Sequence, residues 1–183
     1  MPHKIMIIRH AEAPVPGQFK GVRQSGEDDE HSLIVRGWQR AGALIRFFMR
    51  PEHAAIAVPT HLIGSSHTDD TSRRPHQTLV PLSHAMGLAV DESFTKSQEA
   101  DVAARCLGLD SVVLISWYHE CIPALATAIA PKAKVPQQWP DDCFDRVWVF
   151  DAERDGGWRF QQVPQRLLAG DAAELGRWPC AAL

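Results

Sequence analysis

The stretch Ile5-Met6-Ile7-Ile8-Arg9-His10-Ala11-Glu12 sets four consecutive apolar residues directly before charged and polar ones. A continuous apolar, β-branched run of this kind is typical of a strand buried on both faces of a parallel sheet. In open α/β sheets, ligands bind beyond the carboxyl ends of the strands. The stretch therefore predicts a central strand over residues 5–8 that delivers Arg9 and His10 to a binding site.

Apolar strand-like segments and amphipathic segments alternate through the rest of the chain. Helices are expected over residues 36–49, 77–86, 97–107 and 121–130, and strands over 61–64, 89–91, 111–117, 146–150 and 158–163. Ser97 is a candidate helix N-cap, and Gly87 and Gly108 follow helix ends. Strands separated by helices of this length predict a parallel-type α/β sheet that is covered on both faces. The 183 residues fit one domain, expected to span residues 1–183.

Composition and charge argue against several classes of partner. The chain has 19 Lys and Arg residues against 22 Asp and Glu, and no stretch concentrates the basic ones, so we expect neither nucleic acid nor a membrane surface as a partner. Its longest apolar runs fall short of the roughly 18 residues that a membrane span needs. No secretory signal precedes the first strand, which makes the cytoplasm the expected location. The oligomeric state is left open.

Cysteine and histidine spacing gives no known metal motif. Four cysteines stand singly and are expected to be free thiols: Cys106, Cys121, Cys143 and Cys180. The His119-Glu120 pair could begin a His-Glu-x-x-His zinc motif, but position 123 is Pro. We therefore expect no metal and no other cofactor. The remaining histidines are expected to be surface residues without a role, among them His67, His76 and His84.

A second strand end carries residues that match the first in chemistry. His119 and Glu120 follow the apolar run 111–117, while Arg73 and Arg74 precede the helix expected at residue 77. If the two long strands are neighbours, two imidazoles and one or two guanidiniums meet in one pocket. A neutral imidazole is a nucleophile towards phosphorus, guanidiniums hold phosphoryl oxygens, and a carboxyl group can protonate a leaving oxygen. This set predicts phosphoryl transfer without a metal.

Several motifs, taken in chain order, match those of one known family. Ile7–Glu12 stands where the family has Arg-His-Gly after its first strand, with Ala11 replacing the glycine. Leu33–Ala41 is similar to its Leu-Thr-x-x-Gly-x-x-Gln-Ala helix opening, and Arg74–Thr78 to the end of its Ser-x-x-Arg-x-x-Gln-Thr stretch. Tyr118-His119-Glu120 stands in place of Gly-His-Gly, and Phe144–Val149 is similar to a late strand. Over residues 4–150 the chain resembles the histidine phosphatase superfamily, also called phosphoglycerate-mutase-like.

The resemblance implies a three-layer α/β/α sandwich with a mostly parallel central sheet, and a phosphohistidine intermediate. His10 would be the nucleophile, Arg9 and Arg74 the phosphate clamps, and His119 the second imidazole on the phosphoryl oxygens. Arg73 is an alternative to Arg74, because the spacing back to Ser65-Ser66 is longer than in the family.

The resemblance leaves two candidates for the proton donor. One branch of the family places an acid directly after the second histidine, which would be Glu120. Another uses a glutamate following the third strand, which would be Glu92. Water is the third possibility.

The expected activity is that of a phosphoric monoester hydrolase acting on a small or peptidic phosphate ester or on phosphohistidine. A mutase-type phosphotransferase is less expected, because the short chain leaves little room for insertions that close over a bound product. The replaced glycines keep open a non-catalytic module that binds a phospholigand. Substrate specificity is expected to come from residues 14–31, 68–72 and 132–142.

Overall fold

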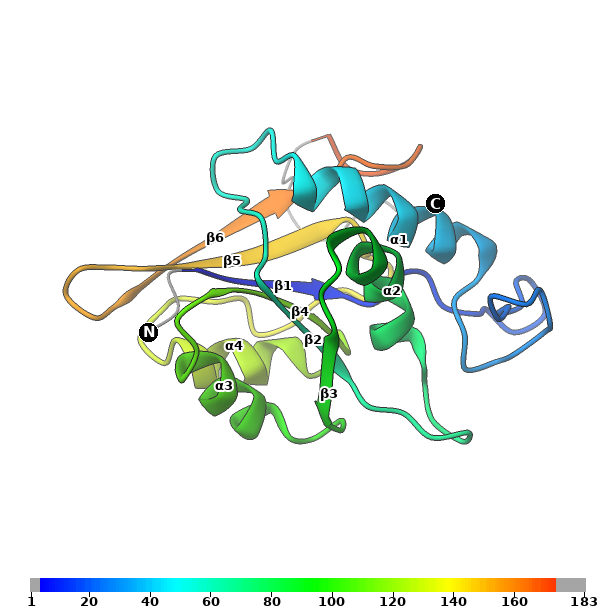
Figure 1. Cartoon of the computed structure of the whole chain (residues 1–183), viewed down its shortest axis with the longest axis horizontal. Coiled ribbons are helices and arrows are strands. Elements are labelled where there is room, and N and C mark those ends of the chain that lie inside the picture. Colours follow the sequence, from blue (N-terminus) through cyan, green and yellow to red (C-terminus); the bar gives the residue numbers. More distant parts are fainter. Residues whose placement is uncertain (1–3, 174–183) are drawn as a thin grey trace.

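The computed structural model describes residues 4–173 and contains, in that range, a six-stranded sheet and four helices (Figure 1). The strands are β1 (Lys4–Arg9), β2 (His61–Ser65), β3 (Val90–Phe94), β4 (Val112–Trp117), β5 (Arg146–Ala152) and β6 (Trp158–Pro164). The helices are α1 (Val35–Met49), α2 (Arg74–Met86), α3 (Glu99–Leu107) and α4 (Ile122–Ile129). None of them has the length and apolar character needed to cross a membrane.

The strands follow the order β3-β2-β4-β1-β5-β6 in one mixed sheet. Neighbours among β3, β2, β4 and β1 pair in parallel, whereas β5 pairs antiparallel with both β1 and β6. Strands β5 and β6 form a hairpin whose turn contains Gly156 at φ +83°, and two strands joined by a short turn must run antiparallel. The predicted α/β fold with a mostly parallel sheet is confirmed. The antiparallel strands, β5 and β6, lie at one end of the strand order.

The helices form one layer on each face of the sheet. Side chains of β1 alternate between the two layers, because successive residues of a strand point to opposite faces. Met6 and Ile8 belong to the core cluster beneath α1 and α2, whereas Ile5 and Ile7 belong to the cluster beneath α3 and α4. All four side chains are fully buried. The result is the expected three-layer α/β/α sandwich (Figure 1).

Two helix starts differ from the sequence prediction by two residues or more. Helix α2 begins at Arg74, three residues before the expected start, because Pro75 lies in the first turn, where its missing N–H leaves no intrahelical hydrogen bond unmade. Helix α3 begins at Glu99, and Gln98 is its N-cap. Ser97 has a left-handed backbone with φ 78°, so the prediction that it caps this helix is wrong.

The expectation of four free thiols is also wrong. Cys106 and Cys121 are free, but Cys143 is disulfide-bonded. Cys180 lies outside the described residues. The single spacing of the cysteines carried no signal for this pairing, because a disulfide requires proximity in the fold rather than in the sequence.

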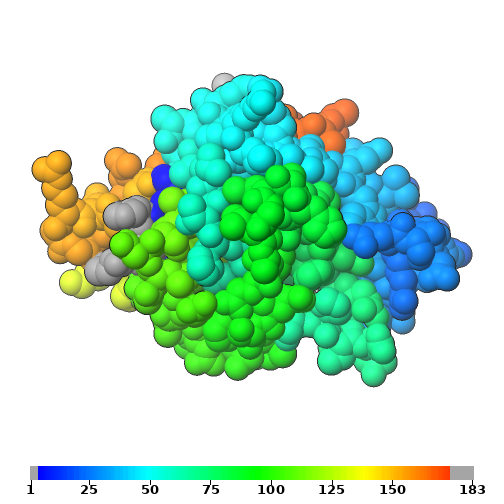
Figure 2. Space-filling model, viewed as in Figure 1, coloured from blue at the N-terminus to red at the C-terminus, as the bar shows by residue number. Residues whose placement is uncertain are grey.

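The connection between β1 and α1 is a long loop that projects at one end of the molecule, opposite the β5–β6 hairpin (Figure 2).

The start of α1 packs against this loop at the point where the loop leaves β1. Ile34 donates its backbone N–H to the carbonyl oxygen of Glu12 at 3.1 Å, and a Cβ atom on Gly37 would lie 2.6 Å from the same oxygen. The buried Arg40 then donates hydrogen bonds to the carboxylates of Glu12 at 2.8 Å and Asp171 at 2.7 Å. The glycine of the 33–41 motif is thus required by close contact between backbones.

Two alanine substitutions in α1 test this contact. We expect Gly37→Ala to lower the free energy of unfolding by about 1–3 kcal/mol, the usual effect of adding an atom where there is no room. Gly42→Ala is the matched control, since a Cβ atom there meets nothing within 4 Å. The control should be neutral or more stable by up to about 1 kcal/mol. Urea unfolding of both variants checks this, and equal effects at both positions would contradict the close contact.

Candidate active site

The two histidine-bearing strand ends meet because β1 and β4 are parallel neighbours. Arg9 lies opposite Trp117 in the register, and the backbone N–H of His10 donates to the carbonyl oxygen of Trp117 at 3.0 Å. Beyond this edge lies a cavity of about 630 Å³. Five of the candidate site residues line it: Arg9, His10, Arg74, His119 and Glu120. The structure therefore brings these five together, while Arg73 and Glu92 lie outside the cavity wall.

His10 is held as a neutral imidazole with a defined tautomer. Its Nδ1 atom lies 2.8 Å from the carbonyl oxygen of Ala11, which can only accept a hydrogen bond, so Nδ1 carries the proton. The lone pair is then on Nε2. Burial, followed by the positive charge of Arg9, lowers the pKa of His10 well below 6.5, and Arg74 and His119 act in the same direction. The ring is thus an unprotonated base beside two cations.

Arg9 is fixed by an aromatic ring and by backbone carbonyls. Its guanidinium carbon lies 3.9 Å from the centre of the Phe144 ring, and its Nη1 atom donates to the carbonyl oxygens of Pro140 and Asp141. Burial lowers the pKa of Arg9 to about 10, which leaves it charged at neutral pH. Phe144 was recognised only as part of a late-strand motif. Its stacking on Arg9 requires the fold to be known.

The two cavity arginines lack carboxylate partners. Arg74 donates to the carbonyl oxygen of Glu30 at 3.1 Å, and neither Arg9 nor Arg74 forms an ion pair within the described part of the chain. The Nε atoms of both are buried without a hydrogen-bond acceptor. Buried donors of native proteins normally have partners, and the planar guanidinium makes paired hydrogen bonds to the oxygens of phosphate or carboxylate. Such an arrangement can hold a phosphate-like anion.

Arg73, the alternative clamp, has a different environment. It forms ion pairs with Asp69 at 2.8 Å and Asp29 at 3.4 Å. Its charge is therefore already neutralised, and it lies in the wall of a different cavity. The geometry favours Arg74 over Arg73 as the anion ligand.

His119 has a carboxylate at each ring nitrogen. Nδ1 lies 3.0 Å from Glu120 and Nε2 lies 3.0 Å from Asp141. Burial and the charge of Arg9 nevertheless lower the pKa of His119 below 6.5. The Asp141 side chain is 96% exposed, so it can move away and leave Nε2 to an anion in the cavity.

The two candidate acids, Glu120 and Glu92, lie in different surroundings. Burial acts to raise the pKa of Glu120, but the hydrogen bond from Lys96 at 2.6 Å and the neighbouring His119 outweigh it and leave the pKa below its usual value. Glu92 was expected just after the third strand, yet β3 continues to Phe94. Glu92 therefore lies within the strand, outside the cavity wall, and ion-pairs with His67, which lines the cavity, and with His76, which does not.

Several residues of the matched motifs have supporting roles that the sequence did not assign. Thr78 accepts the N–H of Ala11 at 2.8 Å, and Gln77 accepts the N–H of Leu33 at 2.9 Å, so both tie α2 to the loop that follows β1. The methyl group of Ala11 is buried in a small apolar cluster with Leu33 and Ala41, which accounts for alanine at the usual glycine position. The remaining cavity wall is rich in hydroxyl groups and includes Ser66, Thr68, Thr71, Ser72, Thr95 and Lys96.

The sheet order, the two helical layers and the position of the cavity define a phosphoglycerate-mutase-like α/β/α fold. A solved structure of this kind, that of the protein histidine phosphatase SixA complexed with tungstate, matches with a TM-score of 0.56. The match covers 88% of this chain and 97% of that one, at 16% sequence identity. At this identity the similarity concerns the fold. No protein-family model and no curated protein sequence matches the chain.

Substitution of the two adjacent arginines tests the anion site. Orthophosphate or vanadate should raise the melting temperature of the wild type, because a ligand of the folded state stabilises it. Arg74→Ala should weaken that binding by roughly 10–100-fold, the range expected when a hydrogen bond to a charged group is lost. Arg73→Ala should bind like the wild type. Equal losses in both variants, or none in either, would contradict the assignment of Arg74.

The lowered pKa of His10 predicts a pH-dependent stability. As the pH falls below 6.5, the unfolded chain binds a proton at His10 while the folded chain does not until its lower pKa is reached. His10 therefore reduces the free energy of unfolding by up to about 1.4 kcal/mol for each pH unit in that window. His10→Gln removes this contribution. Urea unfolding at several pH values should show the variant gaining stability relative to the wild type as pH falls. A constant difference would contradict the neutral, buried state of His10.

Proposed function

We propose that this protein is a phosphatase that transfers a phosphoryl group to His10 and then to water. The observation that carries the proposal is the hydrogen bond from Nδ1 of His10 to the Ala11 carbonyl. It leaves the Nε2 lone pair as a nucleophile beside two guanidiniums that form no ion pair with any residue from 4 to 173. A phosphate ester, small or peptidic, or phosphohistidine would be the substrate. The SixA structure is described as that of a protein histidine phosphatase with bound tungstate, which supports an oxyanion pocket and makes phosphohistidine a first substrate to test.

The proposed reaction has two steps. Nε2 of His10 attacks phosphorus, a P–N bond forms, and the bond from phosphorus to the leaving oxygen or nitrogen breaks. Water then attacks the phosphohistidine, the P–N bond breaks, and orthophosphate is released with His10 neutral again. The net change is hydrolysis of one phosphate ester or phosphoramidate by one water molecule, and no metal takes part.

The cavity cations would stabilise the charge of the transferring group. Arg9 and Arg74 supply N–H donors that no carboxylate occupies, and such donors act most strongly where water is excluded. His119 would donate from Nε2 once the exposed Asp141 has moved aside. Because both arginines are held in place before the anion arrives, little reorganisation is needed at the moment of transfer.

The leaving group must gain a proton when its bond to phosphorus breaks. Glu120, the acid in the cavity, is held ionised by Lys96 and His119. Water would therefore supply the proton unless substrate displaces Lys96. Substrates with good leaving groups, such as aryl phosphates, should need the least help.

The ionised state of Glu120 favours a second candidate function. A protein that keeps the anion pocket but lacks a protonated acid could bind a phospholigand without turning it over. In that case orthophosphate or vanadate would bind through Arg74, and no hydrolysis above background would be found.

Hydrolysis of an aryl phosphate between about pH 5 and 8, with a metal chelator present, distinguishes the two functions. We expect chelator-resistant turnover that His10→Ala lowers by at least about 10³-fold, because the nucleophilic route is lost altogether. Arg73→Ala is the control and should retain activity. Mass spectrometry of enzyme quenched during turnover should show one added phosphoryl group on the wild type. Turnover that survives in His10→Ala would overturn the phosphohistidine route. Background rates in every variant, together with anion binding, would favour the binding module.

A further inference from the structure

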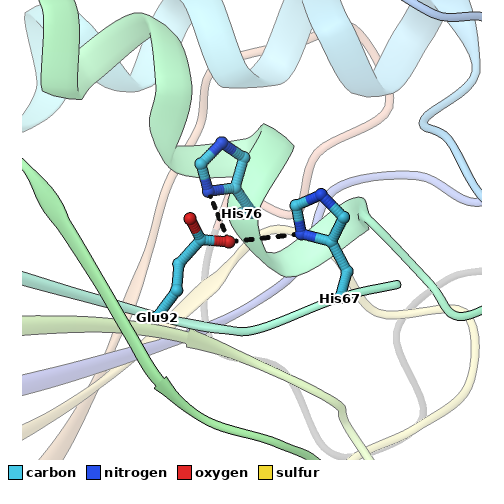
Figure 3. A group of neighbouring side chains, drawn as sticks. All are labelled: His67, His76 and Glu92. Atoms are coloured by element: carbon cyan, nitrogen blue, oxygen red, sulfur yellow. Dashed lines mark ion pairs between the residues drawn. The ribbon is translucent and has the colours of Figure 1, made fainter. Parts of the chain in front are cut away.

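A second group of titratable side chains lies beside the anion cavity. His67 follows β2, His76 is on α2, and Glu92 is on β3 (Figure 3). Nδ1 of His76 lies 2.9 Å and Nδ1 of His67 lies 3.2 Å from the same carboxylate oxygen of Glu92. The imidazole ring centres are 5.3 Å apart. Three elements therefore direct three potential metal ligands to one point.

The short contacts in this group are not hydrogen bonds of the usual geometry. Both Nδ1 atoms are buried, and neither makes a hydrogen bond of good geometry in spite of the short distances to Glu92. Two imidazole nitrogens and one carboxylate oxygen that face one another at short range are groups that can all bind the same cation. A metal ion would satisfy all three, because neutral imidazole and ionised carboxylate are the ligand forms.

We propose that His67, His76 and Glu92 form a binding site for a divalent transition-metal ion of the zinc type. The three ligand atoms all lie within 4.8 Å of one another, and the three side chains are 23%, 27% and 32% exposed. Small side-chain rotations can therefore bring them to the roughly 2.0–2.2 Å that zinc requires. Two imidazoles with one carboxylate suit zinc and its first-row neighbours better than magnesium or calcium, which prefer oxygen ligands alone.

The proposed site would have at least one open coordination position. Three protein ligands leave room for water or another ligand on the ion. His67 and His76 line a cavity of about 470 Å³ whose wall also contains Arg23 and Arg73, and His67 lines the anion cavity as well. A metal ion here would sit between the two cavities. Its three ligands do not include His10, Arg9 or Arg74, so the site does not rest on the proposed phosphatase activity.

Zinc titration of the untagged, chelator-stripped protein tests the site, with isothermal calorimetry and a competing chromophoric chelator as readouts. The wild type should bind one equivalent. His67→Ala, His76→Ala and Glu92→Gln should each weaken binding by at least about tenfold, since even loss of a residue that only supports a ligand has that effect. Glu92→Gln keeps the size of the side chain, so it tests the carboxylate in a fold confirmed by circular dichroism. Excess Mg²⁺ should not displace the zinc.

Two controls separate this site from other histidines. His84 lies on the same helix as His76 and lines the same cavity, but its exposed ring is not one of the three ligands. The His84→Ala variant should therefore bind zinc like the wild type. His119→Ala tests for binding in the anion cavity and should also leave the affinity unchanged. Absence of zinc binding, loss of binding in His119→Ala or His84→Ala instead, or displacement by Mg²⁺ would each overturn the proposal. Zinc binding without phosphatase activity would leave the metal site standing and count against the proposed function alone.

Discussion

The parallel pairing of β1 with β4 is the contact on which the site depends. It sets Arg9 opposite Trp117, so the two strands end at the same level and His10 and His119 enter one cavity. A shift of one residue would turn every β1 side chain to the other face of the sheet. Met6 and Ile8 would then face α3 and α4, and Ile5 and Ile7 would face α1 and α2. Because both faces of β1 are fully buried, such a shift would have to repack both helical layers. The hydrophobic core therefore fixes the register, and the register fixes the site.

Concentration of positive charge at this strand end has a physical cost that the surrounding structure offsets. Arg9 and Arg74 lower the pKa of His10, and burial lowers the pKa values of both arginines. The Phe144 ring and the carbonyl groups of Pro140 and Asp141 compensate Arg9 without neutralising it. Neutral partners of this kind hold a guanidinium in place and leave its charge available. The charge that destabilises the free protein is the charge that would bind an anion.

Much of the fold could be predicted because its signals are local. The apolar runs at residues 5–8 and 111–117 identified β1 and β4, and the positions of His10 and His119 followed from them. The pairing of Lys96 with Glu120 could not be predicted, because the two residues are 24 positions apart and meet through the end of β3. That pairing decides whether Glu120 is an acid or a carboxylate.

The role of Glu92 was missed for a different reason. The strand predicted over Ala89–Asp91 is too short, so the sequence placed Glu92 after the strand rather than in it. In addition, no sequence motif links Glu92 with His67 and His76. Their three elements come together only through the pairing of β3 with β2 and the packing of α2 on both strands. A ligand set assembled in this way has no fixed spacing, so motif searches based on neighbouring residues do not find it.

Strand β3 is also an outer strand of the sheet, and its irregularity matters beyond the site. It pairs only with β2 among the described strands, the register shifts between Ile63 and Ser65, and Asp91 and Glu92 place two carboxylates on it. A short, bulged and charged edge strand is a poor template for pairing with a strand from another molecule. The carboxylate that gathers two histidines therefore also helps to protect the sheet against edge-to-edge aggregation.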